Sequence, residues 1–200
     1  MKEETKLLYN QFMLFVKEGV HDVRSRNHFS WAKNDYTGLN SRNKYMQKLK
    51  RLVKIGKLEE GKTPQGQAYL NDKGNPRLEM PPIYTYFTKW GYYADLAHEL
   101  MHYYRQANNL DFEEKLFYLL FYKDRDLYDL EEIIAEFGAM LLLKKAKIKF
   151  DKELNFFYIE EYLKQFPSIW PKSWLMYFLV WHAERTCKEI HKCYLTNKRF

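Results

Sequence analysis

Residues 98–102 read His98-Glu99-Leu100-Met101-His102, and this stretch decides the interpretation of the chain. It lies within a helical pattern at residues 85–106, where two histidines four residues apart project from one face. Both imidazoles can therefore reach one metal ion. A catalytic Zn²⁺ takes three protein ligands and leaves one position for water. Glu99 stands beside both histidines, and a carboxylate there can take a proton from that water and pass it to a leaving amine.

A second helical pattern, at residues 129–147, offers the third ligand. Its centre, EEIIAEFGAMLLL, is apolar apart from three glutamates. Glu132 and Glu136 are four residues apart on one face, where an unpaired carboxylate would be destabilising. Zinc can neutralise one of them, and the second N–H of a ligand histidine can pair with the other. We expect Glu132 to bind the metal and Glu136 to support it, with the reverse assignment open. Glu131 should face solvent.

The order of these segments resembles a known family. The chain resembles the C-terminal metallopeptidase domain of ArdC-type antirestriction proteins, which has a gluzincin-like arrangement. The resemblance lies in residues 77–104 (RLEMPPIYTYFTKWGYYADLAHELMHYY) and in the later segment EEIIAEFGAMLLL. The later stretches FYIEEYLKQ and AERTCKEI resemble the closing helices of that family. The chain is also similar, more distantly, to the ImmA/IrrE class of regulatory metallopeptidases of mobile elements.

This resemblance implies an α+β, mostly α-helical, zincin-like metallopeptidase domain with a small sheet or hairpin before the active-site helix. It implies Zn²⁺ as the cofactor and a protein or peptide as the substrate. The catalytic acid and base would be Glu99, and the zinc ligands would be His98, His102 and Glu132.

Two departures from the family stand out. The family usually continues H-W-T-G after its motif, whereas Tyr103, Tyr104 and Arg105 follow here. Its N-terminal single-stranded-DNA-binding domain is matched only by traces, such as the segment at residues 36–40.

The net charge divides the chain. The total is 33 Lys and Arg against 26 Asp and Glu, or +7. Residues 1–76 carry 15 basic against 8 acidic residues, which is the whole excess, and residues 77–200 carry 18 of each. We expect a basic N-terminal region at 1–76 that meets an anionic partner, followed by the metallopeptidase domain at 77–200.

Hydrophobic periodicity and turn residues predict the remaining elements. An irregular polar stretch should follow the first helix, and a hairpin should turn at residues 71–76. The predicted segments are helices at 3–19, 44–57, 111–123, 155–165 and 172–195, and the hairpin at 67–80.

The predicted helix at 44–57 is basic and is interleaved with aromatic residues. Cations that follow phosphates, together with aromatic faces that stack on bases, are typical of single-stranded nucleic acid binding. A solvated helix face explains the same lysines equally well. The candidate contacts are Lys48, Lys50, Arg51 and Lys54.

Other polar residues have both a functional and a packing interpretation. A tyrosine hydroxyl could stabilise an oxyanion, and Tyr103 and Tyr104 are the candidates, although packing explains most of the 17 tyrosines more simply. A second metal site is suggested near the C-terminus, but only two of its side chains share a helix face, so we favour packing there. Its four residues are His182, Cys187, His191 and Cys193.

Several classes of protein are excluded. The longest apolar runs are far shorter than the roughly 20 residues that span a bilayer. The acidic, polar N-terminus is a poor signal peptide. Cys187 and Cys193 lie on different helix faces and are not expected to pair, which suits a reducing cytoplasm.

The sequence therefore predicts a zinc metallopeptidase-like protein of a phage or mobile element that acts in the cytoplasm, the host's if phage-encoded. It would hydrolyse a peptide bond with zinc-activated water and Glu99 as general base and acid. One alternative is a DNA-binding antirestriction-type module whose zinc is structural or catalytically silent. Another is a narrow regulatory protease that acts on one repressor.

Overall fold

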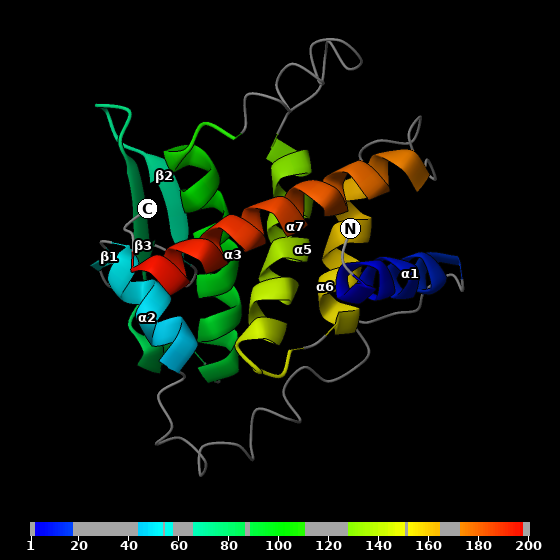
Figure 1. The fold of residues 1–200 in the computed structure, drawn as a ribbon, viewed down its shortest axis with the longest axis horizontal. Helices are drawn as coiled ribbons and strands as arrows, with labels where there is room; N and C mark the ends of the chain where they lie inside the picture. The colour runs from blue at the N-terminus through cyan, green and yellow to red at the C-terminus, as the bar shows by residue number, and fades with distance from the viewer. Residues whose placement is uncertain are drawn as a thin grey trace.

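Helix α5 (Tyr128–Lys145) is the central element of the fold and contacts α3 (Lys89–Ala107), α6 (Lys152–Lys164) and α7 (Ser173–Thr196) (Figure 1). Most of its residues are buried, because apolar side chains surround the helix instead of lining one face. The computed structural model describes residues 3–17, 44–53, 55–57, 66–86, 89–110, 128–150, 152–164 and 173–197.

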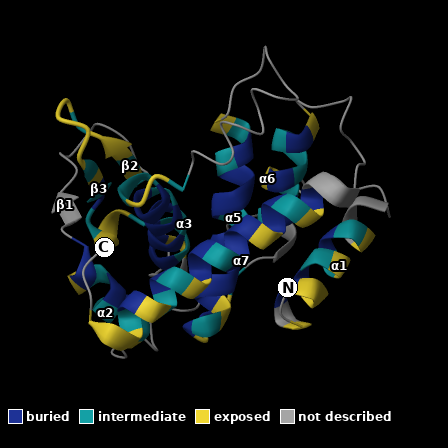
Figure 2. Ribbon diagram, turned by 45° about the horizontal axis from the view of Figure 1, so that its top comes forward, coloured by how far each residue is buried: buried dark blue, intermediate teal, exposed yellow. Residues whose placement is uncertain are grey.

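The remaining helices pack around this centre. Helix α7 crosses α3 and α5 in Figure 1, and α1 (Glu3–Lys17) contacts α6 and α7. The Phe12 ring of α1 is fully buried and meets Phe137 and Phe156 edge-on, with centroids 5.5 Å and 5.4 Å away. The short helix α2 (Lys44–Leu52) buries Met46 and Leu49 and contacts α7. Figure 2 shows α5 buried along nearly its whole length, while α1 and β2 carry exposed residues.

A small sheet covers one side of α3. Strands β1 (Ile55–Lys57), β2 (Gln67–Leu70) and β3 (Pro76–Met80) have the order β1-β3-β2. Strand β1 pairs with β3 in parallel and β2 pairs with β3 antiparallel. A 3-10 turn, η2 (Ile83–Thr85), leads into α3. The sheet contacts α3 through β2 and β3, so it lies directly beside the helix that carries residues 98–102.

Helices α3 and α5 approach closely at Gly138. A Cβ built at this glycine would collide with the side chain of Met101 on α3. Because glycine lacks that atom, the side chain of Met101 can lie directly against the α5 backbone. This contact keeps the two helices near enough for short polar side chains to meet between them.

Most predicted elements are confirmed, with small shifts at their ends. The α+β, mostly α-helical fold class is confirmed, as is the hairpin at 67–80. The predicted helix at 44–57 is wrong at its end, because α2 stops at Leu52 and residues 55–57 pair with β3 as a strand. Neither the irregular stretch at 21–43 nor the helix at 111–123 falls within the described residues.

The division of the chain at residue 76 stays a prediction. Described elements on both sides of it contribute to one sheet and one apolar core. Within the described ranges, no helix has the length and apolar character that crossing a bilayer requires.

Candidate metal centre

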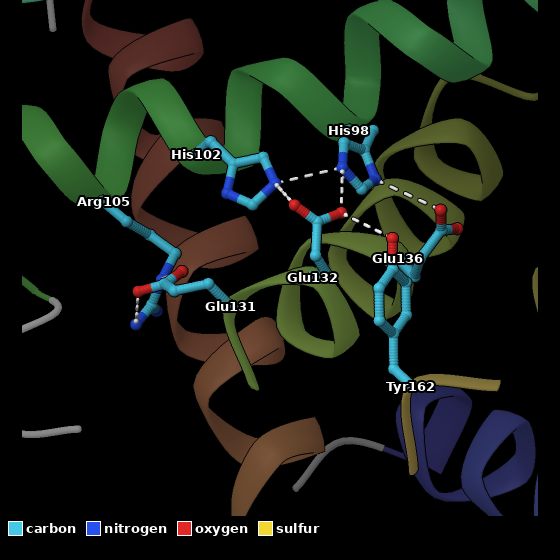
Figure 3. A network of polar contacts seen from close by, with 7 residues as sticks. All are labelled: His98, His102, Arg105, Glu131, Glu132, Glu136 and Tyr162. Carbon is cyan, nitrogen blue, oxygen red and sulfur yellow. Dashed lines mark hydrogen bonds and ion pairs between the residues drawn. The ribbon is translucent and has the colours of Figure 1, made fainter. Parts of the chain in front are cut away.

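The two histidines of α3 face each other across one helical turn. His98 Nε2 and His102 Nε2 are 3.0 Å apart, and their side chains are 15% and 12% exposed. Figure 3 shows both rings on the side of α3 that faces α5. The spacing of four residues therefore has the predicted consequence, since two ring nitrogens point at one place.

Glu132 of α5 completes a group of three. Its Oε2 lies 3.1 Å from His98 Nε2, and its Oε1 lies 3.3 Å from His102 Nε2. Ligand atoms of a tetrahedral Zn²⁺ with bonds of about 2.0–2.1 Å lie about 3.3 Å from one another. The observed separations of 3.0–3.3 Å match that edge length, and two imidazoles with one carboxylate are a donor set that zinc accepts. The three side chains could thus hold a metal ion and leave its fourth position open.

Glu136 meets the opposite side of the first histidine. Its Oε1 lies 3.3 Å from His98 Nδ1, whereas Glu132 faces the Nε2 atoms. Asn155 of α6 donates a hydrogen bond of 2.5 Å from Nδ2 to Glu136 Oε2. Glu132 and Glu136, for which the reverse assignment was open, therefore occupy different positions around His98.

The charges in this group stabilise one another. Burial alone would lower the pKa of His98, but the hydrogen bonds and charges of Glu132 and Glu136 outweigh it and raise that pKa well above its usual range. Burial likewise works to raise the pKa of Glu132, but His102 and His98 hold it well below its usual range. The metal-free group thus favours a protonated imidazole beside an ionised carboxylate, and a metal ion would replace that proton.

Glu99 is buried against the sheet, next to the histidines. A Cβ at Gly66 would lie only 3.0 Å from Glu99 Cγ, so the backbone before β2 packs against this side chain. Asp95, one turn earlier on α3, accepts hydrogen bonds from the Gly66 amide (2.6 Å) and from the Tyr86 hydroxyl. Burial raises the pKa of Glu99. A carboxylate with a raised pKa accepts a proton more readily than an exposed one, as a general base must.

Comparison with known proteins agrees with this geometry. A family model described as a zincin-like metallopeptidase (MPTase-PolyVal) matches residues 49–168, which is more than half of the chain and includes all six polar side chains described above on α3 and α5. The chain belongs to the zincin-like metallopeptidase family. Neither the curated proteins nor the solved structures give a match.

The tyrosines expected to serve the site have other partners in this zincin-like metallopeptidase. Tyr104 hydrogen-bonds Cys193 of α7, and Tyr103 lies near Arg77 of β3; both phenols are buried. An oxyanion role for Tyr103 or Tyr104 stays a prediction.

Two other tyrosines approach the site. Tyr162 of α6 donates a 3.3 Å hydrogen bond to Glu132 Oε2. Tyr128 also hydrogen-bonds Glu132 and lies near Glu99; burial together with these carboxylates raises the pKa of Tyr128 to about 12. Tyr128 is 58% exposed, so it lies where the site meets solvent.

The basic residues of α2 are partly engaged within the fold. Lys48 lies over the Tyr194 ring, 4.3 Å from its centroid, and Lys50 lies 4.8 Å from the centroid of Tyr92. Arg51 is exposed, and Lys54 falls outside the described residues. Nucleic-acid contact by these four residues stays a prediction.

The four C-terminal candidates for a second metal site all lie along α7. The His182 ring packs on Phe178 and Trp181, with centroids 4.3 Å and 4.9 Å away. His191 stacks on Tyr194, and the two cysteines are buried and not joined in a disulfide.

The expectation that Glu131 faces solvent is wrong, because this side chain pairs with a buried arginine. It accepts a 2.8 Å hydrogen bond from Arg105 Nε, and the guanidinium is almost fully buried. Sequence reasoning noted Arg105 only as a departure from the family pattern. Tyr128 could have been found from its spacing of four residues before Glu132, whereas Asn155 reaches the site from another helix and leaves no local signal.

Proposed function

We propose that this chain is a zinc-dependent peptidase in which His98, His102 and Glu132 hold the metal. The convergence of their ligand atoms at 3.0–3.3 Å, with Glu99 beside them, is the observation that supports it. Zinc, when bound there, supplies Lewis-acid activation of water and of a peptide carbonyl. The residues of the chain supply the remaining functions.

Glu136 would fix the state of the first ligand. With its carboxylate at Nδ1, His98 carries its proton on that nitrogen and presents an unprotonated Nε2 to the metal. The Asn155 amide holds Glu136 in turn. This division of roles favours Glu132 over Glu136 as the third ligand.

Glu99 would move the proton of the reaction. It takes the proton from the attacking water and delivers it to the leaving amine, so that one carboxylate serves both steps. Its burial suits this role, because a raised pKa makes this carboxylate a better proton acceptor than an exposed glutamate. Tyr128, partly exposed and hydrogen-bonded to Glu132, is the best-placed phenol to meet a developing oxyanion.

The test compares wild type with Glu99→Gln, both loaded with one equivalent of zinc. Cleavage of an unfolded protein mixture is followed by mass spectrometry. We expect Glu99→Gln to keep its zinc and to lose about 10²–10⁴-fold in cleavage rate. Glu189→Gln, a partly exposed glutamate on α7, is the matched control and should cleave like wild type. Full activity of Glu99→Gln would overturn the proposed role.

The finer parts of the proposal rest on the sequence. The resemblance to antirestriction and regulatory metallopeptidases supports a protein of a phage or mobile element that works in the cytoplasm. The alternative of a narrow regulatory protease acting on one repressor would leave the unfolded protein mixture uncleaved. The basic excess of residues 1–76 supports contact with single-stranded DNA. Zinc retention without any cleavage, together with oligonucleotide binding that falls steeply with salt, would favour the alternative of a DNA-binding module with a structural zinc.

A further inference from the structure

The polar side chains between α3 and α5 form a ladder with three rungs. His98, His102 and Arg105 are spaced by four and three residues, so they share one face of α3. Their partners descend along α5 in the opposite direction. The rungs are His98–Glu136, His102–Glu132 and Arg105–Glu131 (Figure 3).

The third rung differs from the other two because it has no ligand role in the proposed site. Arg105 is 1% exposed. Its Nε donates to Glu131 Oε2 at 2.8 Å and its Nη2 to Oε1 at 3.4 Å, a two-point contact that fixes both distance and orientation. Its Nη1 donates to Thr186 of α7 at 3.0 Å, and Nη2 is 3.5 Å from the Leu110 carbonyl.

A buried ion pair of this kind is a poor device for stability. Removing two charges from water often outweighs their attraction, and apolar replacements of similar volume are frequently as stable. The pair is directional, however, whereas the surrounding apolar contact between α3 and α5 is not. Its distinctive contribution is to fix where α5 lies along α3.

That axial position matters for the metal site. Glu132 and Glu136 are one helical turn apart, or about 5.4–6 Å along the axis. A displacement of α5 by a fraction of a turn would move Glu132 away from the two Nε2 atoms and bring Glu136 nearer. The ladder in its observed register presents Glu132 to both histidines.

We propose that the Arg105–Glu131 ion pair is a register lock, a positioning device that sets α5 against α3 so that Glu132, and not Glu136, faces both histidines. This inference rests on the proposed zinc site. Neither Arg105 nor Glu131 touches the metal position, so both act through the helices that carry the ligands.

The test replaces both partners at once, in Arg105→Met/Glu131→Leu, which leaves no unpaired charge buried. Unfolding of the metal-free protein is measured, and zinc affinity is measured by competition with a chromophoric chelator. We expect an unfolding midpoint near that of wild type, with zinc affinity weaker by about 10–100-fold. We also expect Glu132→Gln and Glu136→Gln, each added to the double variant, to differ less in zinc affinity than when each is introduced into wild type.

Thr186→Val is the matched control, because it removes a partner of Arg105 that lies on neither ligand helix. It should leave zinc affinity close to that of wild type. Should the double variant not fold, Arg105→Lys keeps the charge but loses the two-point contact, and it should still weaken zinc binding.

Two results would overturn the lock. One is that the folded double variant, or Arg105→Lys in its place, binds zinc with wild-type affinity, while Glu132→Gln and Glu136→Gln differ in zinc affinity as much as they do in wild type. The other is an equal loss of affinity in Thr186→Val. Both would leave the proposed zinc site standing, whereas a wild-type chain that binds no zinc would overturn the site and the lock together.

Discussion

Two parts of this chain carry histidines beside other potential metal ligands at helical spacing, and they have different fates in the fold. Between α3 and α5, side chains from two helices converge within 4.8 Å of one another. Along α7, from His182 to Cys193, all the candidates belong to one helix, and the rings of His182 and His191 pack on different aromatic neighbours. Spacing along one helix brings two potential ligands together, and here a third comes from Glu132 on a second helix that faces them.

The largest effect should separate these two regions directly. Glu132→Gln removes an anionic ligand and leaves His98 and His102 without their shared carboxylate. We expect zinc affinity to fall by more than about 100-fold, a larger loss than removal of an outer partner causes. Cys187→Ser/His191→Gln on α7 should bind zinc like wild type in the same chelator competition. A loss of zinc in the α7 variant would contradict the expectation that only the residues between α3 and α5 bind the metal.

A smaller loss of zinc affinity is expected from Glu136, which contacts His98 Nδ1, and from Asn155, which contacts Glu136. Glu136→Gln should weaken zinc binding by about 10–100-fold, because the amide orients the imidazole less firmly than a carboxylate. Asn155→Ala should act in the same direction but less strongly, since it acts only through Glu136. Titration calorimetry measures both. A stronger effect from Asn155→Ala than from Glu136→Gln would contradict the proposed order of contacts.

The last effect concerns the folding stability contributed by His182 of α7, and it depends on pH. Burial first, and then the charges of Arg105 and Arg185, lower the pKa of His182 to about 4 in the folded chain. The unfolded chain, with a histidine pKa of about 6.5, binds more protons in this window, so stability falls as pH drops from about 6.5 toward 4. We expect about 1–3 kcal/mol of stability to be lost in this range.

The check is chemical denaturation of metal-free protein, with chelator present, at pH 5 and pH 7.5. His182→Leu cannot take up the proton and should lose part of this pH dependence. If the free energy of unfolding changes equally between pH 5 and pH 7.5 in wild type and variant, His182 is not held neutral by its surroundings.

The same comparison explains how far the sequence could be interpreted. The two helices of the site carry local sequence signals, and both were predicted. In α3 the signal is the fixed spacing of residues 98–102, and in α5 it is a charged Glu132 within an apolar segment. Glu132 and Glu136 share one helix face, so only the packing of α5 against α3 could give them different positions. Asn155 and the Arg105–Glu131 pair depend on contacts between separate helices, which periodicity within one helix cannot indicate. The short strand at 55–57 was missed because three residues after a basic helix leave no alternating pattern.

The most direct test of the account is the metal content of the purified chain. Elemental analysis should find one zinc per wild-type chain, none in His98→Ala, and one in His191→Ala. A wild-type chain without stoichiometric zinc, or a His98→Ala variant that keeps it, would contradict a metal centre between α3 and α5.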